Sequence, residues 1–131
     1  MAEVILKHKQ ISGVQVRSAG IYAMPNAEMS ANAQQVLNDA NMPHQHLATQ
    51  LSIEEVAWAH LILTMTTAHK ETIIANYPNT EEKVFTLKEF TNEGSLENVG
   101  DPYGGNKAIY EATFAELNEL VERLVKILEK N

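Results

Sequence analysis

The pattern of apolar and polar residues predicts short strands alternating with helices. Residues 14–18 alternate apolar and polar side chains, which is the period of a strand with one face covered. Residues 60–65 form a nearly continuous apolar run, typical of a strand in a parallel sheet that is covered on both faces. A further short strand is predicted over residues 83–87. We expect residues 60–65 to be the most buried strand of the sheet.

Two long amphipathic segments lie at the ends of the chain. Residues 1–11 carry apolar side chains at helical spacing, but neither a capping residue nor a loop precedes them. Residues 106–130 predict a long helix whose apolar stripe packs against the core. That stripe consists of Ile109, Phe114, Leu117, Leu120, Val121, Leu124 and Leu128.

Hydroxyl residues mark the starts of three shorter helices. Ser30 is a suitable N-cap for a helix that ends before Pro43. Ser52 opens a capping box, and Trp58 in the helix that follows is most simply a core or helix-packing residue. Thr66 or Thr67 caps the next helix.

The alternation of strands and helices predicts one α/β domain spanning residues 1–131. Its parallel sheet is flanked by helices in three layers, with right-handed crossovers. In such folds ligands bind beyond the carboxyl ends of the strands. Residues 18–20, residues 64–66 and the loop that contains Asp101 are expected to meet at that edge.

Composition limits the classes of function. The chain has 131 residues, 44% of them apolar, and a net charge of −7, which argues against nucleic acid or an anionic membrane as partner. No signal segment opens the chain and no apolar run is as long as a membrane span, so we expect a cytoplasmic protein. The sequence contains no cysteine and therefore no disulfide, thiolate metal site or thiol nucleophile.

The segment Asp101-Pro102-Tyr103-Gly104-Gly105 is the strongest candidate for chemistry. Its proline and glycines are ordinary turn residues when taken alone. An acid on a stiff loop ahead of a helix is also well placed to donate a proton. Because three polar loops are expected to converge on one sheet edge, we favour a functional Asp101. We interpret His44 and His46 as exposed loop residues rather than metal ligands, since no third ligand is near them in sequence.

Five segments together form a recognisable combination. They are Met1-Ala2-Glu3, Val16-Arg17-Ser18-Ala19-Gly20, Met65-Thr66 with His69-Lys70, Val84-Phe85-Thr86-Leu87-Lys88-Glu89, and Asp101-Pro102-Tyr103-Gly104-Gly105. In this order and spacing the chain resembles the low-molecular-weight protein phosphatases, and within them the bacterial protein-arginine-phosphatase branch. Tyrosine-specific members usually carry a second aromatic residue where this chain has Gly104, which favours the arginine branch.

The resemblance implies a protein phosphatase that uses neither a metal nor an organic cofactor. Its substrate would be a protein carrying phosphoarginine or phosphotyrosine. The resemblance makes Asp101 the general acid, which protonates the leaving group and then activates water. We predict that Ser18, Gly20, Thr66 and Tyr103 line the binding edge.

The resemblance also implies a missing piece. The family begins with a central strand and a phosphate-binding loop of the form Cys-x5-Arg-Ser, which would precede Met1. We therefore expect the chain to be N-terminally incomplete and inactive, with a gap between residues 14–18 and 60–65. A bare sheet edge would then favour self-association or low stability. Two alternatives stay open: a non-catalytic binding or regulatory protein, or a complete enzyme in which Met1 is an internal methionine.

Overall fold

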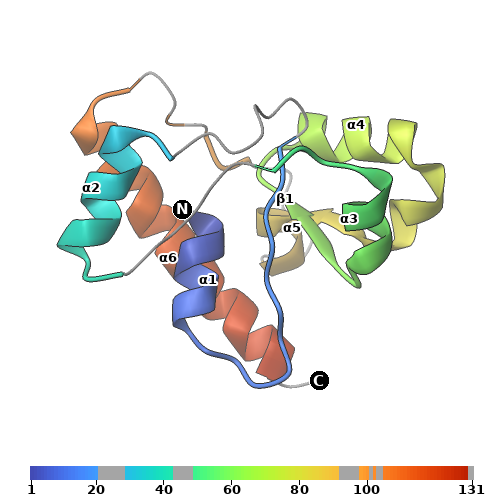
Figure 1. Ribbon diagram of the computed structural model, residues 1–131, viewed down its shortest axis with the longest axis horizontal. Coiled ribbons are helices and arrows are strands. Elements are labelled where there is room, and N and C mark those ends of the chain that lie inside the picture. Colours follow the sequence, from blue (N-terminus) through green and yellow to red (C-terminus); the bar gives the residue numbers. More distant parts are fainter. Residues whose placement is uncertain (21–28, 43–48, 92–97, 101, 103–104, 130–131) are drawn as a thin grey trace.

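The computed structural model describes residues 1–20, 29–42, 49–91, 98–100, 102 and 105–129. Within them the order of elements is α1 (Ala2–His8), α2 (Ala31–Asp39), α3 (Ile53–Trp58), β1 (Ile62–Thr64), α4 (Thr67–Asn76), the 3-10 helix η1 (Pro78–Lys83), β2 (Val84–Thr86), α5 (Leu87–Thr91) and α6 (Lys107–Glu129). The fold is α/β, as predicted, with a parallel sheet flanked by helices (Figure 1).

The sheet of the described chain consists of β1 and β2, joined through α4 and η1. The two strands pair in parallel, with Ile62 opposite Val84 and Thr64 opposite Thr86. The prediction for residues 60–65 was too long, and their burial was overestimated. Ile62 and Leu63 are only half-buried, whereas Val84 in β2 is fully buried. An apolar run is buried on both faces only where both faces are covered, and the described elements cover β1 incompletely.

The predicted strand over residues 14–18 is absent, which corrects that expectation. The segment runs between α1 and β1 in Figure 1, but no described segment forms a ladder with it. A strand needs a hydrogen-bonded neighbour, and the alternating pattern supplies only the side chains. Pairing begins two residues later, where the Gly20 N–H donates to the Thr49 carbonyl and the Leu51 N–H donates to the Gly20 carbonyl, both at 2.8 Å.

An open hollow lies between the end of α1 and this extended segment. Its volume is about 310 Å³, and its lining mixes apolar and amide side chains. The lining residues are Leu6, Lys7, Gln10, Ile11, Val14, Gln15 and Val16. The inner side of the 14–16 segment is thus not packed tightly against α1.

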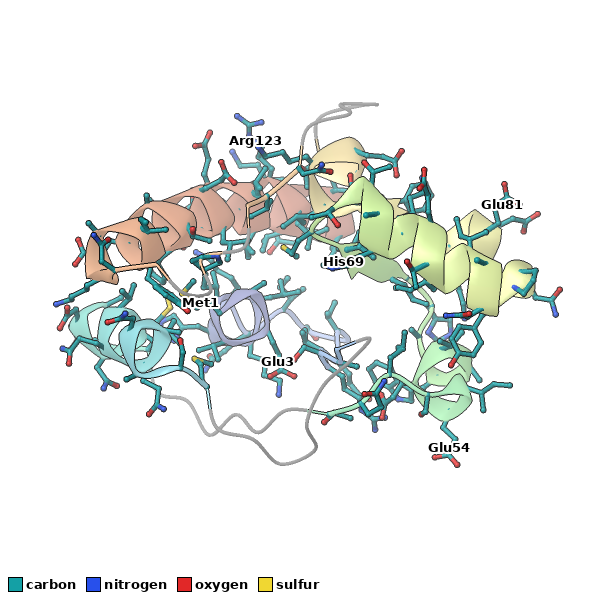
Figure 2. The ribbon with its side chains drawn as sticks, turned by 90° about the horizontal axis from the view of Figure 1, so that it is seen from above. Met1, Glu3, Glu54, His69, Glu81 and Arg123 are labelled. Carbon is teal, nitrogen blue, oxygen red and sulfur yellow. The ribbon has the colours of Figure 1, made fainter. Side chains whose placement is uncertain are left out.

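The main core joins the first and last helices of the described chain. α1, α2 and α6 lie together on one side of the extended segment in Figure 1, and α5 contributes from the other side. The fully buried members include Ile5, Leu37 and Leu124. Figure 2 shows Met1 between α1, α2 and α6. There it packs against the main core and against a second, smaller cluster formed by Ala33, Val36 and Tyr110. The apolar stripes predicted for the two terminal helices therefore face each other.

The three predicted N-caps are confirmed. Ser30 accepts the Ala33 N–H, Ser52 accepts the Glu55 N–H and Thr66 accepts the His69 N–H through their hydroxyl oxygens, each bond closing the first turn of its helix.

Two details of the terminal helices differ from prediction. The first helix ends at His8 rather than at residue 11, because Gln10 adopts a left-handed conformation with φ of 51°. Ile109 in α6 is 49% exposed and does not join the buried stripe. It lies in the first turn of the helix, beyond the reach of the main core, which begins further along at Leu117.

Candidate functional site

The segment just before Asp101 is tied to the carboxyl end of β1. The Val99 N–H donates to the Met65 carbonyl at 2.9 Å, and the Val99 side chain is 1% exposed within the main core. The side-chain oxygen of Asn98 accepts from both the backbone N–H (2.8 Å) and the hydroxyl (3.1 Å) of Thr67 at the start of α4. Residues 98 and 99, which lead to Asp101, are therefore held at the edge formed by residues 64–66.

The segment just after Asp101 is fixed by different contacts. The Gly105 N–H donates to the Pro102 carbonyl at 2.8 Å, which closes a turn over residues 102–105. Asn106 caps α6 by accepting the Ile109 N–H at 3.0 Å. From α2, the Asn32 side-chain amide donates to the Gly105 carbonyl at 3.3 Å. Two separate parts of the fold thus hold the two ends of the loop.

The predicted site residues fall into two groups. Asp101 and Tyr103 lie outside the described residues. Thr66 lies beside the anchored loop, but its hydroxyl accepts the His69 N–H at 3.1 Å as the cap of α4. Ser18 is half-buried and Gly20 pairs with Gln50. No hydrogen bond between described residues joins either of these two to Thr66, so their meeting at one site stays a prediction.

Sequence reasoning missed an ion pair at the carboxyl end of β2. Lys70 of α4 lies 2.7 Å from the Glu89 carboxylate of α5, and its ammonium is 5.8 Å from the centroid of the Phe85 ring. Glu89 also accepts the Thr86 N–H at 3.1 Å, while the Thr86 hydroxyl accepts the Glu89 N–H at 3.0 Å. This reciprocal pair is a capping box, and the spacing Thr86-x-x-Glu89 was a signal that could have revealed it.

The ion pair changes the acidity of Glu89. The hydrogen bond from Lys70 is the main cause that holds the pKa of Glu89 below its ordinary value, and the Thr86 N–H adds to the effect. Burial opposes the shift. Glu89 is therefore an ionised structural clamp between α4 and α5 rather than a proton donor at neutral pH.

A second contact of this kind fixes the extended segment to α3. The Arg17 guanidinium lies 4.1 Å from the centroid of the Trp58 ring and 3.5 Å from the Glu55 carboxylate. Trp58 is half-buried and stacks against Arg17, so of its two predicted roles the one in the core is not seen. This stacking holds the segment that leads to Ser18.

Neither a metal cluster nor a membrane span emerges from the described part of the chain. No three side chains of His, Asp or Glu gather there in a way that could hold a metal ion. None of the helices in those same ranges is long and apolar enough to cross a bilayer. His44 and His46 lie outside the described residues.

Comparison with known proteins gives consistent matches over the whole chain. The family model for low molecular weight phosphotyrosine protein phosphatase matches residues 1–131. A protein-arginine-phosphatase of Geobacillus stearothermophilus is 38% identical over 129 residues, which cover 98% of this chain and 86% of the relative. The low molecular weight protein-tyrosine-phosphatase PtpB of Staphylococcus aureus is 34% identical over 128 residues, which cover 98% of this chain and 88% of that protein.

Solved structures agree with the sequence matches. The structure of an arginine phosphatase from Geobacillus stearothermophilus superposes with a TM-score of 0.96 at 36% identity, covering 98% of this chain and 83% of that one. A superposition this close, at 36% sequence identity, shows that the two chains share a fold and are related. The chain belongs to the low molecular weight phosphotyrosine protein phosphatase family.

Proposed function

We propose that this chain is the scaffold of a protein phosphatase that acts on phosphoarginine in proteins, with Asp101 as its general acid. Family membership supports the reaction class. The observation that carries the role of Asp101 is the two-sided anchoring of its loop, from the Val99–Met65 bond before it to the Pro102–Gly105 turn after it. General acid catalysis requires a positioned side chain, and these bonds fix the backbone before and after Asp101.

The preference for phosphoarginine over phosphotyrosine rests on two supports. The relative from Geobacillus stearothermophilus named as a protein-arginine-phosphatase is 38% identical, compared with 34% for the staphylococcal tyrosine phosphatase. Gly104 also stands where tyrosine-specific members usually carry a second aromatic residue. A cytoplasmic location and a phosphorylated protein as partner belong to the same proposal.

These 131 residues contain only some of the catalytic groups that the family resemblance implies. The implied mechanism needs a cysteine thiolate to attack phosphorus, and these 131 residues contain no cysteine. We therefore propose that this 131-residue chain hydrolyses neither phosphate esters nor the P–N bond of phosphoarginine. The same observation favours a second candidate function, a non-catalytic module that recognises phosphorylated or unmodified protein with the surviving sheet edge.

An activity assay of two polypeptides tests this proposal. The chain as printed is assayed with p-nitrophenyl phosphate and with a phosphoarginine peptide, and we expect no turnover. Activity that survives repurification and is lost in Asp101→Asn would contradict the inactive state.

The same assay is then repeated on a chain to which a Cys-x5-Arg-Ser strand and loop have been added before Met1. We expect this addition to restore activity. In the restored enzyme, Asp101→Ala should lower turnover of esters with poor leaving groups by about 10²–10⁴-fold, with a smaller loss for p-nitrophenyl phosphate. If poor leaving groups were released at the original rate, Asp101 would not be the acid. A restored chain that stayed inactive while binding phosphopeptide would favour the non-catalytic alternative.

A further inference from the structure

Asn32 makes a contact that neither the helix nor the core requires. It is the second residue of α2, whose N-terminal N–H groups are already capped by Ser30. The half-buried Asn32 side chain instead reaches across 73 residues of sequence and donates to the Gly105 carbonyl at 3.3 Å. An amide that leaves its own helix to bind a distant loop carbonyl fixes the position of that loop.

Gly105 is a sensitive place for such a contact. Its N–H donates to the Pro102 carbonyl and closes the turn, while its carbonyl accepts from Asn32. Both backbone polar groups of Gly105 are therefore hydrogen-bonded. An added Cβ would lie 2.9 Å from the Pro102 carbonyl oxygen and 3.0 Å from two carbon atoms of Ile109. Because the Gly105 N–H is bonded to the Pro102 carbonyl, the position of Gly105 is coupled to Pro102, the residue that follows Asp101.

The rest of α2 stabilises the base of the loop rather than the loop itself. Ala33 and Val36 of α2 pack against Tyr110 of α6. Asp39 of α2 forms an ion pair with Lys107 of α6 at 3.0 Å. These contacts join α2 to α6 without involving Pro102 or Gly105. Asn32, in contrast, donates its side-chain amide directly to the turn.

We propose that Asn32 is a positioning residue for the Asp101 loop, acting through the Gly105 carbonyl. The inference rests on the proposed role of Asp101. It adds a residue from a different helix, remote in sequence from the loop, to the groups on which the alignment of the acid depends.

The test uses a pair of matched substitutions in α2. Asn32→Asp has the same shape but no donor, and a carboxylate in the first turn is favourable for the helix. Gln34→Glu is its control, because Gln34 also donates its amide to a backbone carbonyl, but to that of Met29 at 2.6 Å rather than to that of Gly105. Asn32→Ala removes the donor without adding charge, and Asn32→Gln keeps a donor on a longer arm.

The first readout is hydrogen exchange at the Gly105 amide in the chain as printed, measured by NMR. We expect exchange to accelerate about tenfold or more in Asn32→Asp and Asn32→Ala, to change less in Asn32→Gln, and to stay within twofold in Gln34→Glu. The melting temperature of Asn32→Asp should stay close to that of the parent chain. Equal Gly105 exchange in the parent, Asn32→Asp and Asn32→Ala would overturn the proposal.

The second readout separates this inference from the proposed function. In the restored enzyme, Asn32→Asp should slow esters with poor leaving groups more than p-nitrophenyl phosphate, and Gln34→Glu should slow neither. If Asp101→Ala is damaging but Asn32→Asp and Asn32→Ala do not discriminate between leaving groups, the positioning role is refuted. If Asp101→Ala itself is harmless, the proposed function fails, and the exchange data alone decide whether Asn32 anchors the turn.

Discussion

Gly105→Ala should destabilise the protein because the turn has no room for a methyl group. The new Cβ would lie 2.9 Å from the Pro102 carbonyl oxygen, closer than a carbon and an oxygen normally approach. That oxygen accepts the Gly105 N–H at 2.8 Å, so it cannot move away without losing the bond. The Ile109 side chain, also 3.0 Å away, is half exposed and is free to rotate.

The expected loss follows from two opposing effects. Overpacking of this kind costs about 1–3 kcal/mol. Replacing glycine also restricts the unfolded chain, which contributes about 0.4–1 kcal/mol of stability in the opposite direction. The net expectation is a destabilisation of about 1 kcal/mol, equivalent to a fall of roughly 3–5 °C in melting temperature for a chain of this size.

Urea unfolding followed by circular dichroism measures this difference, with Gly100→Ala as the matched control. A Cβ at Gly100 would meet no heavy atom within 4 Å. That variant should therefore gain about 0.4–1 kcal/mol from the unfolded state alone. Adding Ile109→Ala to Gly105→Ala should relieve only part of the loss, because the carbonyl contact remains. If Gly105→Ala proved as stable as Gly100→Ala, the tight packing of the turn would be refuted.

Three further predictions concern the clamp, the core and the sheet. The folded pKa of Glu89 is below its ordinary value of 4.5, so its contribution to stability is complete above that value and is lost as pH falls through the lower, folded pKa. Glu89→Gln should flatten this part of the pH–stability curve measured by thermal melts, and an unchanged curve would contradict the clamp. Leu37→Ala, at a fully buried position, should cost about 2–5 kcal/mol in urea unfolding, whereas a loss below 1 kcal/mol would show a loosely packed core. The chain should self-associate in light scattering, and a peptide carrying the family's first strand should raise its melting temperature, because a ligand that binds only the folded state stabilises it. A monomer that melts cooperatively and ignores the peptide would show that the sheet is complete without another strand.

Local chemistry made the helices readable from sequence. Ser30, Ser52 and Thr66 each predicted the start of a helix, and all three are N-caps in the structure. N-capping could be predicted because it depends only on a hydroxyl group and the three residues that follow it. The strand at 62–64 and its parallel partner at 84–86 were likewise found, since period and composition are local properties.

Features that depend on tertiary neighbours were misjudged. The alternating pattern of residues 14–18 says nothing about whether a strand lies alongside, and among the described residues none does. The hydrogen bond from Asn32 to Gly105 could not be predicted, because the two residues are 73 positions apart and no local pattern connects them. For the site, sequence predicted the edge at which the loop is anchored through Met65 and Val99, but not the amide side chains that anchor it.

The packing of α1 against α6 has a consequence for biosynthesis. Ile5 is synthesised long before Leu117 and Leu124, yet the cluster that buries it includes both of them. During translation the apolar face of α1 therefore stays uncovered until α6 has left the ribosome. A core that joins such distant residues also folds slowly, because a long loop must close before any contact rewards it. The nascent chain should be a prolonged client of chaperones, and premature termination within α6 should produce an aggregation-prone product rather than a smaller folded one.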